Sequence, residues 1–464
     1  MEAGAEQLLG WLREPGRPRV VPAAALQQAL KVSQPTLSRW VRAAGEDVLR
    51  IGRGRATGYA LPRSVGRAGA CWPLHRIAAD GRPVTLGVLH ALRGESFWFE
   101  TATVHPVFQH GEFAQGLYPG LPWFLDDQRP QGFLGRSFAV RHAQPLGAPP
   151  DLARWQADDI LLALLQFGQD SPGDLVLGDT ALRHALSQQQ APEAISTGAR
   201  TTHYPKFAAQ VLAGDPIGSS AGGEQPKFAL TLDEPGGRWR PVIVKFSEPL
   251  SSAASTRWAD LLRCEHLAGT VLRAHGLPAA ESELLEAGGR LYLQSTRFDR
   301  TPTLGRIGVV SLAALDAAFL GHGHRDWWQL APQLEREGWL SAADAHVLAV
   351  IGWFGQLIGN TDMHLGNAAL LVHDARPLAL APVYDMLPMR WRPSTSGEVI
   401  DRPGWMVTLP LPVERAAWRQ AAPVALDFWQ HAQADRELTP SFRAIASQAA
   451  QAVEATWRRE RGAS

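Results

Sequence analysis

The residues with the clearest chemical capacity lie in one short stretch, residues 358–367, which follows an apolar segment. Within it, Asp362 and Asn367 form an Asp-x-x-x-x-Asn pattern. This is the spacing of a kinase catalytic loop, in which the aspartate orients the attacking hydroxyl and accepts its proton while the asparagine binds Mg²⁺. Further on, Asp385 ends an apolar run, where a second Mg²⁺ ligand belongs. On its own, the pattern favours an ordinary polar loop at the end of a helix.

Two upstream features could meet the phosphates of a nucleotide. Lys245 lies in an apolar run, and a lysine on such a strand neutralises phosphates when a helix carboxylate holds it. Glu265, in a helix predicted over 255–275, is the expected partner. Residues 218–227 are rich in glycine and serine, so their N–H groups could cradle phosphate oxygens, with Lys227 adding charge. Singly, these features also fit a solvent-reaching lysine and an ordinary glycine-rich turn.

The order of these features decides between the interpretations. A glycine-rich loop, a strand lysine, a helix glutamate, the Asp-x-x-x-x-Asn pattern and a later aspartate follow one another as in kinases, so their joint occurrence indicates phosphoryl transfer. Residues 218–222 also match Gly-x-Ser-x-Gly. A hydrolase needs a strand before that motif and a helix after it, and neither is expected here. His322 and His324 lack further ligands at metal spacing, so a polar loop is expected there.

The elements that must position these groups are predicted from apolar periodicity and turns. Strands are expected at 228–232 and 241–246, and a hairpin about residues 288–289. Helices are expected at 160–167, 255–275, 312–319, 327–336, 342–358 and 441–458. Before them, β-prone runs at 84–89, 96–100 and 138–140 alternate with turns. The expected α+β fold of 464 residues divides into an N-terminal module 1–65, a β-rich subdomain 68–150, a nucleotide-binding lobe 151–300 and a helical catalytic lobe 301–464.

The first 65 residues are predicted to form a winged helix-turn-helix. Helices near 8–12, at 23–30 and at 34–43, the last capped by Ser33, precede two short strands at 48–51 and 58–61. Residues 1–67 hold eleven Lys/Arg and five Asp/Glu, so they carry +6 within a neutral chain. Double-stranded DNA is the expected partner, and protein contact is the alternative. The candidates for base edges are Gln34, Thr36, Ser38 and Arg39, and those for phosphates are Arg42, Arg53 and Arg55.

The sequence also indicates the cellular compartment in which the protein works. Cys71 and Cys264 lie far apart, so reduced thiols in a cytosolic protein are expected. The first ten residues lack the layout of a signal peptide. The most apolar stretches are shorter than the roughly 20 residues that span a bilayer. We therefore expect a cytoplasmic protein with no membrane partner.

Several strings together resemble a known family. They are Ser-Ser-Ala-Gly-Gly-Glu-Gln-Pro-Lys at 219–227, Arg-Phe-Asp-Arg at 297–300, Thr-Asp-x-His-x-x-Asn at 361–367 and Pro-Val-Tyr-Asp at 382–385. They are similar to the HipA-like serine/threonine kinases, the toxins of bacterial toxin–antitoxin systems. The chain looks most like the subgroup called YjjJ or HipH, which carries an N-terminal helix-turn-helix. The resemblance spans about residues 70–450 and implies a two-lobed, protein-kinase-like fold.

The resemblance also implies roles for individual residues. Asp362 would be the catalytic base, Asn367 and Asp385 would hold Mg²⁺, and Lys245 would bind phosphates. The rest of the implied ATP-binding set comprises the phosphate loop Gly222, Gly223, Glu224, Gln225, Pro226 and Lys227, the hinge residues Thr296, Arg297 and Phe298, and His364.

The sequence thus predicts an ATP- and Mg²⁺-dependent serine/threonine protein kinase of a toxin–antitoxin type. Ser220 falls where the family carries a serine whose autophosphorylation switches the kinase off, and Ser219 is the neighbouring alternative. The family's targets include an aminoacyl-tRNA synthetase, so the resemblance implies a translation component as the protein substrate without assigning that enzyme here. Better-known members pair with a separate DNA-binding antitoxin, and a module on the same chain leaves that partner open.

Two other classes of protein are alternatives to this prediction. One is a DNA-binding transcription regulator whose kinase-like body senses a ligand without transfer activity. The complete set Lys245, Asp362, Asn367 and Asp385 argues against an inactive kinase. The other is a nucleic-acid-cleaving enzyme, which would need a metal cluster near the basic module, and residues 1–67 contain no histidine.

Overall fold

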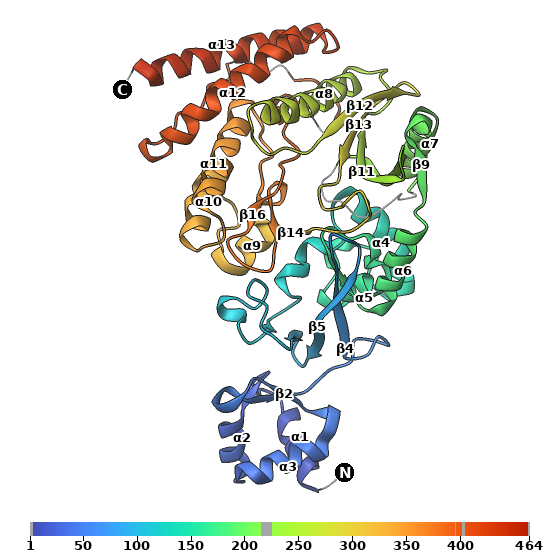
Figure 1. Cartoon of the computed structure of the whole chain (residues 1–464), viewed down its shortest axis with the longest axis vertical. Coiled ribbons are helices and arrows are strands. Elements are labelled where there is room, and N and C mark those ends of the chain that lie inside the picture. The colour runs from blue at the N-terminus through green and yellow to red at the C-terminus, as the bar shows by residue number, and fades with distance from the viewer. Residues whose placement is uncertain (1–2, 215–224, 395, 401–403, 463–464) are drawn as a thin grey trace.

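The computed structural model describes residues 3–214, 225–394, 396–400 and 404–462. The chain forms an elongated molecule, with the N-terminal helices at one end and the two C-terminal helices at the other (Figure 1). Four sheets lie in the described part of the chain. Across the same ranges, none of the helices combines the length and the apolar character that crossing a membrane requires.

The N-terminal end is a small unit of three helices and a three-stranded sheet. Leu8 and Leu12 recur at helical spacing and share a buried core with Leu26 and Leu37 of the next two helices. Ser33 caps the third helix, since the Thr36 N–H donates to its Oγ at 3.4 Å. The elements, in the sheet order β1-β3-β2, are α1 (Ala3–Arg13), β1 (Val21–Pro22), α2 (Ala23–Leu30), α3 (Gln34–Ala44), β2 (Leu49–Ile51) and β3 (Gly58–Ala60).

This unit packs directly on the middle of the chain. Ile51 and Ala60 of its sheet belong to one buried cluster with Trp98. Next to the cluster, Arg93 donates from Nη1 to the carbonyl of Leu12 at 2.8 Å. The shared cluster and this hydrogen bond hold the unit against its neighbour rather than leaving it on a free linker.

The middle of the chain is a five-stranded antiparallel sheet with three helices beside it. Its order is β7-β6-β5-β4-β8, and β8 lies beyond the boundary at residue 150 that the sequence predicted. The strand predicted at 138–140 is wrong, because Phe138 lies in a helix and packs with His142 one turn on and with Phe167. The elements are β4 (Cys71–Ile77), β5 (Pro83–Leu92), β6 (Ser96–Glu100), β7 (Leu117–Tyr118), α4 (Gly132–Leu146), α5 (Ala157–Phe167), β8 (Leu175–Leu177) and α6 (Asp179–Gln190).

The second five-stranded sheet, ordered β12-β13-β11-β10-β9, is covered on both faces. Tyr204 of α7 packs on Phe228 and Tyr292 on one face. On the other face, Leu262 of α8 packs with Leu293. The elements are β9 (Ala194–Ser196), α7 (Arg200–Leu212), β10 (Lys227–Glu234), β11 (Arg238–Phe246), α8 (Ala253–Ala274), β12 (Ser282–Ala287) and β13 (Arg290–Thr296).

The C-terminal region is mostly helical and has a core rich in tryptophan. Trp429 donates from Nε1 to the Leu357 carbonyl at 3.0 Å, which ties α12 to the end of α11. The predicted helix 312–319 is a short α-helix followed by one π turn, Asp316–Leu320. The elements, with the small sheet ordered β14-β15-β16, are β14 (Gly308–Ser311), α9 (Leu312–Leu315), α10 (Trp327–Arg336), α11 (Ala342–Leu357), β15 (Ala369–Val372), β16 (Ala379–Leu380), α12 (Arg415–Ala434) and α13 (Pro440–Gly462).

Candidate active site

Lys245 lies at the centre of the candidate site. It is on β11, an inner strand of the second sheet, and only 6% of it is exposed. Its Nζ donates to Glu265 Oε1 of α8 at 2.6 Å and to Asp385 Oδ1 at 2.5 Å. A strand, a helix and the loop that follows β16 therefore converge on one ammonium group. The structure brings together the lysine and the glutamate that the sequence paired, and adds the aspartate.

A second lysine balances the charges of this cluster. Lys227 pairs directly with Lys245 across β10 and β11 and is also buried. Burial lowers the pKa of Lys245, but the Asp385 and Glu265 carboxylates outweigh it, so the pKa lies above its ordinary value. Burial raises the pKa of Asp385, and the two lysines outweigh it, so this pKa lies below its ordinary value. The site therefore holds Lys245 as a charged ammonium group, which can bind phosphates.

The loop after α11 presents Asp362. Asn360 holds this loop, because its Oδ1 accepts the Asp362 N–H at 3.1 Å and its Nδ2 donates to the Asp385 carbonyl at 3.2 Å. Asn367 donates from Nδ2 to the Asp362 carbonyl at 2.9 Å. Both asparagines are buried, whereas Asp362 is exposed. The loop is thus fixed through its backbone and leaves the Asp362 carboxylate open to a substrate.

Sequence reasoning did not single out Asn360. Its only signal was a polar residue placed directly after an apolar helix and two positions before the candidate base. The structure shows that it joins the backbone of Asp362 to that of Asp385, so it sets the position of one relative to the other.

Asn367 and Asp385 offer the oxygen ligands that Mg²⁺ prefers. The Nδ2 of Asn367 is engaged by the Asp362 carbonyl, so its Oδ1 is the atom that can face a cation. Asp385 has a φ of 57°, a left-handed conformation that costs a non-glycine residue about 1–3 kcal/mol and that concentrates at functional sites. Proteins usually bind Mg²⁺ through one or two such oxygens together with substrate phosphates. The two residues fit this ion.

The predicted hinge lies where β13 leaves the sheet. Thr296 ends the strand, and its N–H donates to the Glu281 carbonyl at 2.8 Å. The Phe298 ring stacks on Tyr384, with centroids 5.9 Å apart and planes at 29°. The Tyr384 hydroxyl donates to the Gly366 carbonyl at 2.9 Å. Tyr384, to which sequence reasoning gave no role, therefore connects the hinge with the catalytic loop.

The side chain of Arg297 lies in a buried ion cluster. Its guanidinium donates to Asp170 Oδ1 at 2.9 Å and to Asp299 at 2.9 and 3.0 Å, and Arg300 bonds both carboxylates. Burial raises the pKa of Asp299, but the two arginines outweigh it and hold the pKa well below its usual range. The guanidinium thus ties the hinge to the middle of the chain, and the Arg297 N–H donates to the Pro241 carbonyl at 2.9 Å. The nucleotide contact expected for Arg297 stays a prediction.

Part of the predicted phosphate loop lies outside the described residues. The described part leads into β10, where the Phe246 N–H donates to the Pro226 carbonyl at 3.3 Å and Gln225 is half-buried. Beyond the second sheet, His364 is exposed beside Asp362, and its Nδ1 accepts the Gly366 N–H at 3.1 Å. The predicted residues outside the described ranges are Ser219, Ser220, Gly222, Gly223 and Glu224.

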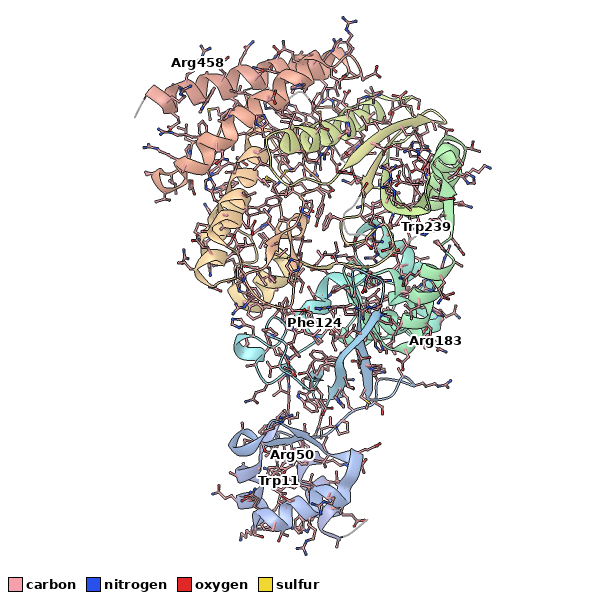
Figure 2. All side chains as sticks on the ribbon, viewed as in Figure 1. Trp11, Arg50, Phe124, Arg183, Trp239 and Arg458 are labelled. Carbon is pink, nitrogen blue, oxygen red and sulfur yellow. The ribbon has the colours of Figure 1, made fainter. Side chains whose placement is uncertain are left out.

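The basic N-terminal unit exposes most of the predicted DNA-contacting residues. Thr36 is half-buried, and its hydroxyl shares a hydrogen bond of 3.0 Å with Ser33 at the helix cap, so its base contact stays a prediction. Arg50 of β2 is exposed as well (Figure 2). The side chain of Arg55 is not among those described. The exposed candidates are Gln34, Ser38, Arg39 and Arg42 on α3 and Arg53 in the turn after β2.

Comparison with known proteins assigns the family. The model of the HipA-like C-terminal domain matches residues 219–457. The fold and the site thus define a HipA-like protein with a kinase-like fold. The model of the middle domain of YjjJ-like toxins matches residues 68–186. The chain is 36% identical over 444 residues to toxin YjjJ of Escherichia coli (strain K12), covering 93% of this chain and 94% of the relative. The chain belongs to the YjjJ-like branch of the HipA-like toxin family.

Two further comparisons are more distant. HipA of Shewanella oneidensis MR-1, solved in a complex with HipB and its operator DNA, has a TM-score of 0.54 and 14% identity, and the match covers 84% of this chain and 97% of that one. This likeness shows the shared fold. Y4dM of Sinorhizobium fredii (strain NBRC 101917 / NGR234), a candidate kinase by its name, is 27% identical over 288 residues, which cover 58% of this chain and 62% of the relative.

Proposed function

We propose that this chain is an ATP- and Mg²⁺-dependent serine/threonine protein kinase of a toxin–antitoxin type. The observation that carries the proposal is the convergence of Glu265 and Asp385 on the buried Lys245, with the Asp362 loop attached to Asp385 through Asn360. A purely structural ion pair needs no exposed carboxylate beside it. A phosphotransferase needs all these groups in one place.

The proposed reaction joins a protein hydroxyl oxygen to the γ-phosphorus of ATP. The bond between that phosphorus and the β–γ bridging oxygen breaks, and ADP leaves with its electron pair. Lys245 and Lys227 bind and orient the phosphates, and Asp362 accepts the hydroxyl proton at its carboxylate. When bound, Mg²⁺ neutralises phosphate charge, and Asn367 and Asp385 would hold it. Thr296 to Phe298 would form the hinge against the adenine.

The full-length chain incubated with γ-labelled ATP and Mg²⁺ is expected to transfer label to itself and to a protein of the cell extract. EDTA should abolish the label, because the phosphate charge is then not neutralised. Mass spectrometry of the labelled chain would show whether Ser220 or Ser219 carries the phosphate. Absence of label on the chain and on every extract protein, with Mg²⁺ present, would overturn the proposal and favour a ligand-sensing regulator.

The N-terminal residues 1–65 are proposed to form a winged helix-turn-helix that binds double-stranded DNA. Support comes from the order of three helices and a small sheet, from the exposed polar face of α3 and from the net charge of +6 over residues 1–67. The structure of the Shewanella protein holds both a partner, HipB, and operator DNA. A separate antitoxin is therefore a further proposed partner, and a translation component is the proposed class of protein substrate.

Arg42→Ala combined with Arg53→Ala is expected to weaken binding to a fluorescent, non-specific duplex. Both side chains are exposed, and each lost phosphate contact lowers the slope of log K against log salt by about 0.9, so the slope should fall by about 2. Fluorescence anisotropy across a salt series measures this. The matched control is Arg183→Ala with Arg238→Ala, two exposed arginines of the body (Arg183 in Figure 2). An equal loss in the control, or none in the test variant, would place the DNA site elsewhere.

A further inference from the structure

Residues 404–413 form an exposed apolar strip, here called the apolar strip, that belongs to none of the sheets in the described ranges. Its ten residues carry no charge. The exposed fractions are 86% for Met406, 57% for Leu409, 59% for Leu411 and 90% for Val413. Exposed apolar side chains gathered in this way mark interaction sites in proteins.

Residues 404–411 of the strip have two different faces, and Pro412 and Val413 begin the short 3-10 turn Pro412–Glu414. Trp405 and Val407 turn inward and pack against the main hydrophobic core, whereas Met406 between them turns outward. The ring of Trp405 packs edge-on against Trp391, with centroids 5.5 Å apart. Pro410 is buried between the exposed Leu409 and Leu411. Because its inner face packs against the hydrophobic core, the strip presents its outer apolar face in a fixed position.

The strip is also attached to the catalytic loop at two points. The Gln356 side chain of α11 donates to the Thr408 hydroxyl at 2.8 Å. A Cβ on the preceding residue, Gly355, would meet the side chain of Met363, the neighbour of Asp362. Adjacent residues of one helix turn thus touch the strip and the catalytic loop.

At the other end of the loop, the Trp391 ring lies against Gly359, three positions before Asp362. The same ring packs on Trp405 of the strip. The buried Trp391 ring therefore connects the strip to the loop that carries the candidate base.

We propose that the apolar strip binds an extended, apolar segment of the protein substrate next to its phosphorylated serine or threonine. This inference rests on the proposed kinase function. The attachment of the strip to both ends of the Asp362 loop favours the substrate as the occupant, because a segment bound to the strip lies near the base that accepts its hydroxyl proton. An uncharged strip selects uncharged, apolar side chains, because burying them there desolvates no charge.

A library of serine-centred peptides, with one flanking position fixed at a time, tests the inference on the full-length chain with labelled ATP and Mg²⁺. The wild-type chain should favour apolar residues at a set distance from the serine. Met406→Ser with Leu409→Ser should reduce that preference roughly tenfold. The peptide then loses the burial of about one apolar side chain, which corresponds to roughly a tenfold change in affinity. Autophosphorylation should be unchanged, because neither residue touches the nucleotide site.

The matched control is Val104→Ser with Val140→Ser, whose valines are 59% and 78% exposed in the middle of the chain. The control should keep the apolar preference. Labelled peptides with no apolar preference, or a preference unchanged by the Met406/Leu409 variant, would overturn the inference. A change from dimer to monomer in that variant, measured by light scattering, would show that a second copy occupies the strip. Failure of the kinase proposal itself is different, because neither the chain nor any peptide is then labelled.

Discussion

Asp362→Ala is expected to lower the rate of phosphoryl transfer by about 10²- to 10⁴-fold, the range typical of a positioned proton acceptor. The loop does not depend on the carboxylate, since Asp362 is held by its N–H on Asn360 and by its carbonyl on Asn367. Removing the side chain leaves both bonds in place. The Kd for MgATP should therefore stay close to that of the wild-type chain. Label incorporation measures transfer, and calorimetry measures binding.

Asp233→Ala is the matched control for this variant, because Asp233 is an exposed carboxylate on β10. It should change neither transfer nor binding. Full transfer activity in the Asp362 variant would mean that the hydroxyl proton goes to another group. Loss of nucleotide binding in parallel with transfer would place Asp362 among the nucleotide ligands and would also contradict the assignment.

Much of the candidate site could be predicted because its motifs are local. Residues 361–367 carry the candidate base and one candidate Mg²⁺ ligand within a single loop, so the two could be predicted together once the order of the other motifs indicated a kinase. Lys245 stands in a run of apolar residues that is typical of a strand, and β11 spans that run. Helix ends were predictable where a side chain caps them, as at Ser33. The HipA-like family followed from the same strings.

Features that depend on contacts between residues far apart in the sequence could not be predicted. Arg297 is held by Asp170, 127 positions earlier, and no spacing rule connects the two. The bond from Asn360 to the Asp385 carbonyl spans 25 positions. Helix α12 contains Pro423, which normally argues against a helix, yet its buried face overrides that preference by packing between α11 and α13. At Phe138, packing against α5 overrides a local preference for strand.

The ion pairs of Lys245 with Glu265 and Asp385 predict a second large effect. Lys245→Met should abolish measurable transfer and lower the free energy of unfolding by about 3–5 kcal/mol, the usual cost of removing one partner from a buried ion pair. Glu265 is only 8% exposed, and in the described structure its Oε2 has no hydrogen-bond partner, so the variant also deprives Oε1 of its bond to Lys245. Urea unfolding followed by tryptophan fluorescence measures the change.

Lys245→Met combined with Glu265→Met separates the two roles of the lysine. The double variant removes the buried Glu265 carboxylate together with its lysine partner. The remaining acid, Asp385, is 24% exposed and therefore retains contact with water. Most of the lost stability should therefore return, as it does when a buried pair is replaced by apolar side chains of similar volume. Transfer should stay absent, since the phosphates still lack their ammonium partner. If activity returned together with stability, Lys245 would be a structural residue and the proposed phosphate contact would be wrong.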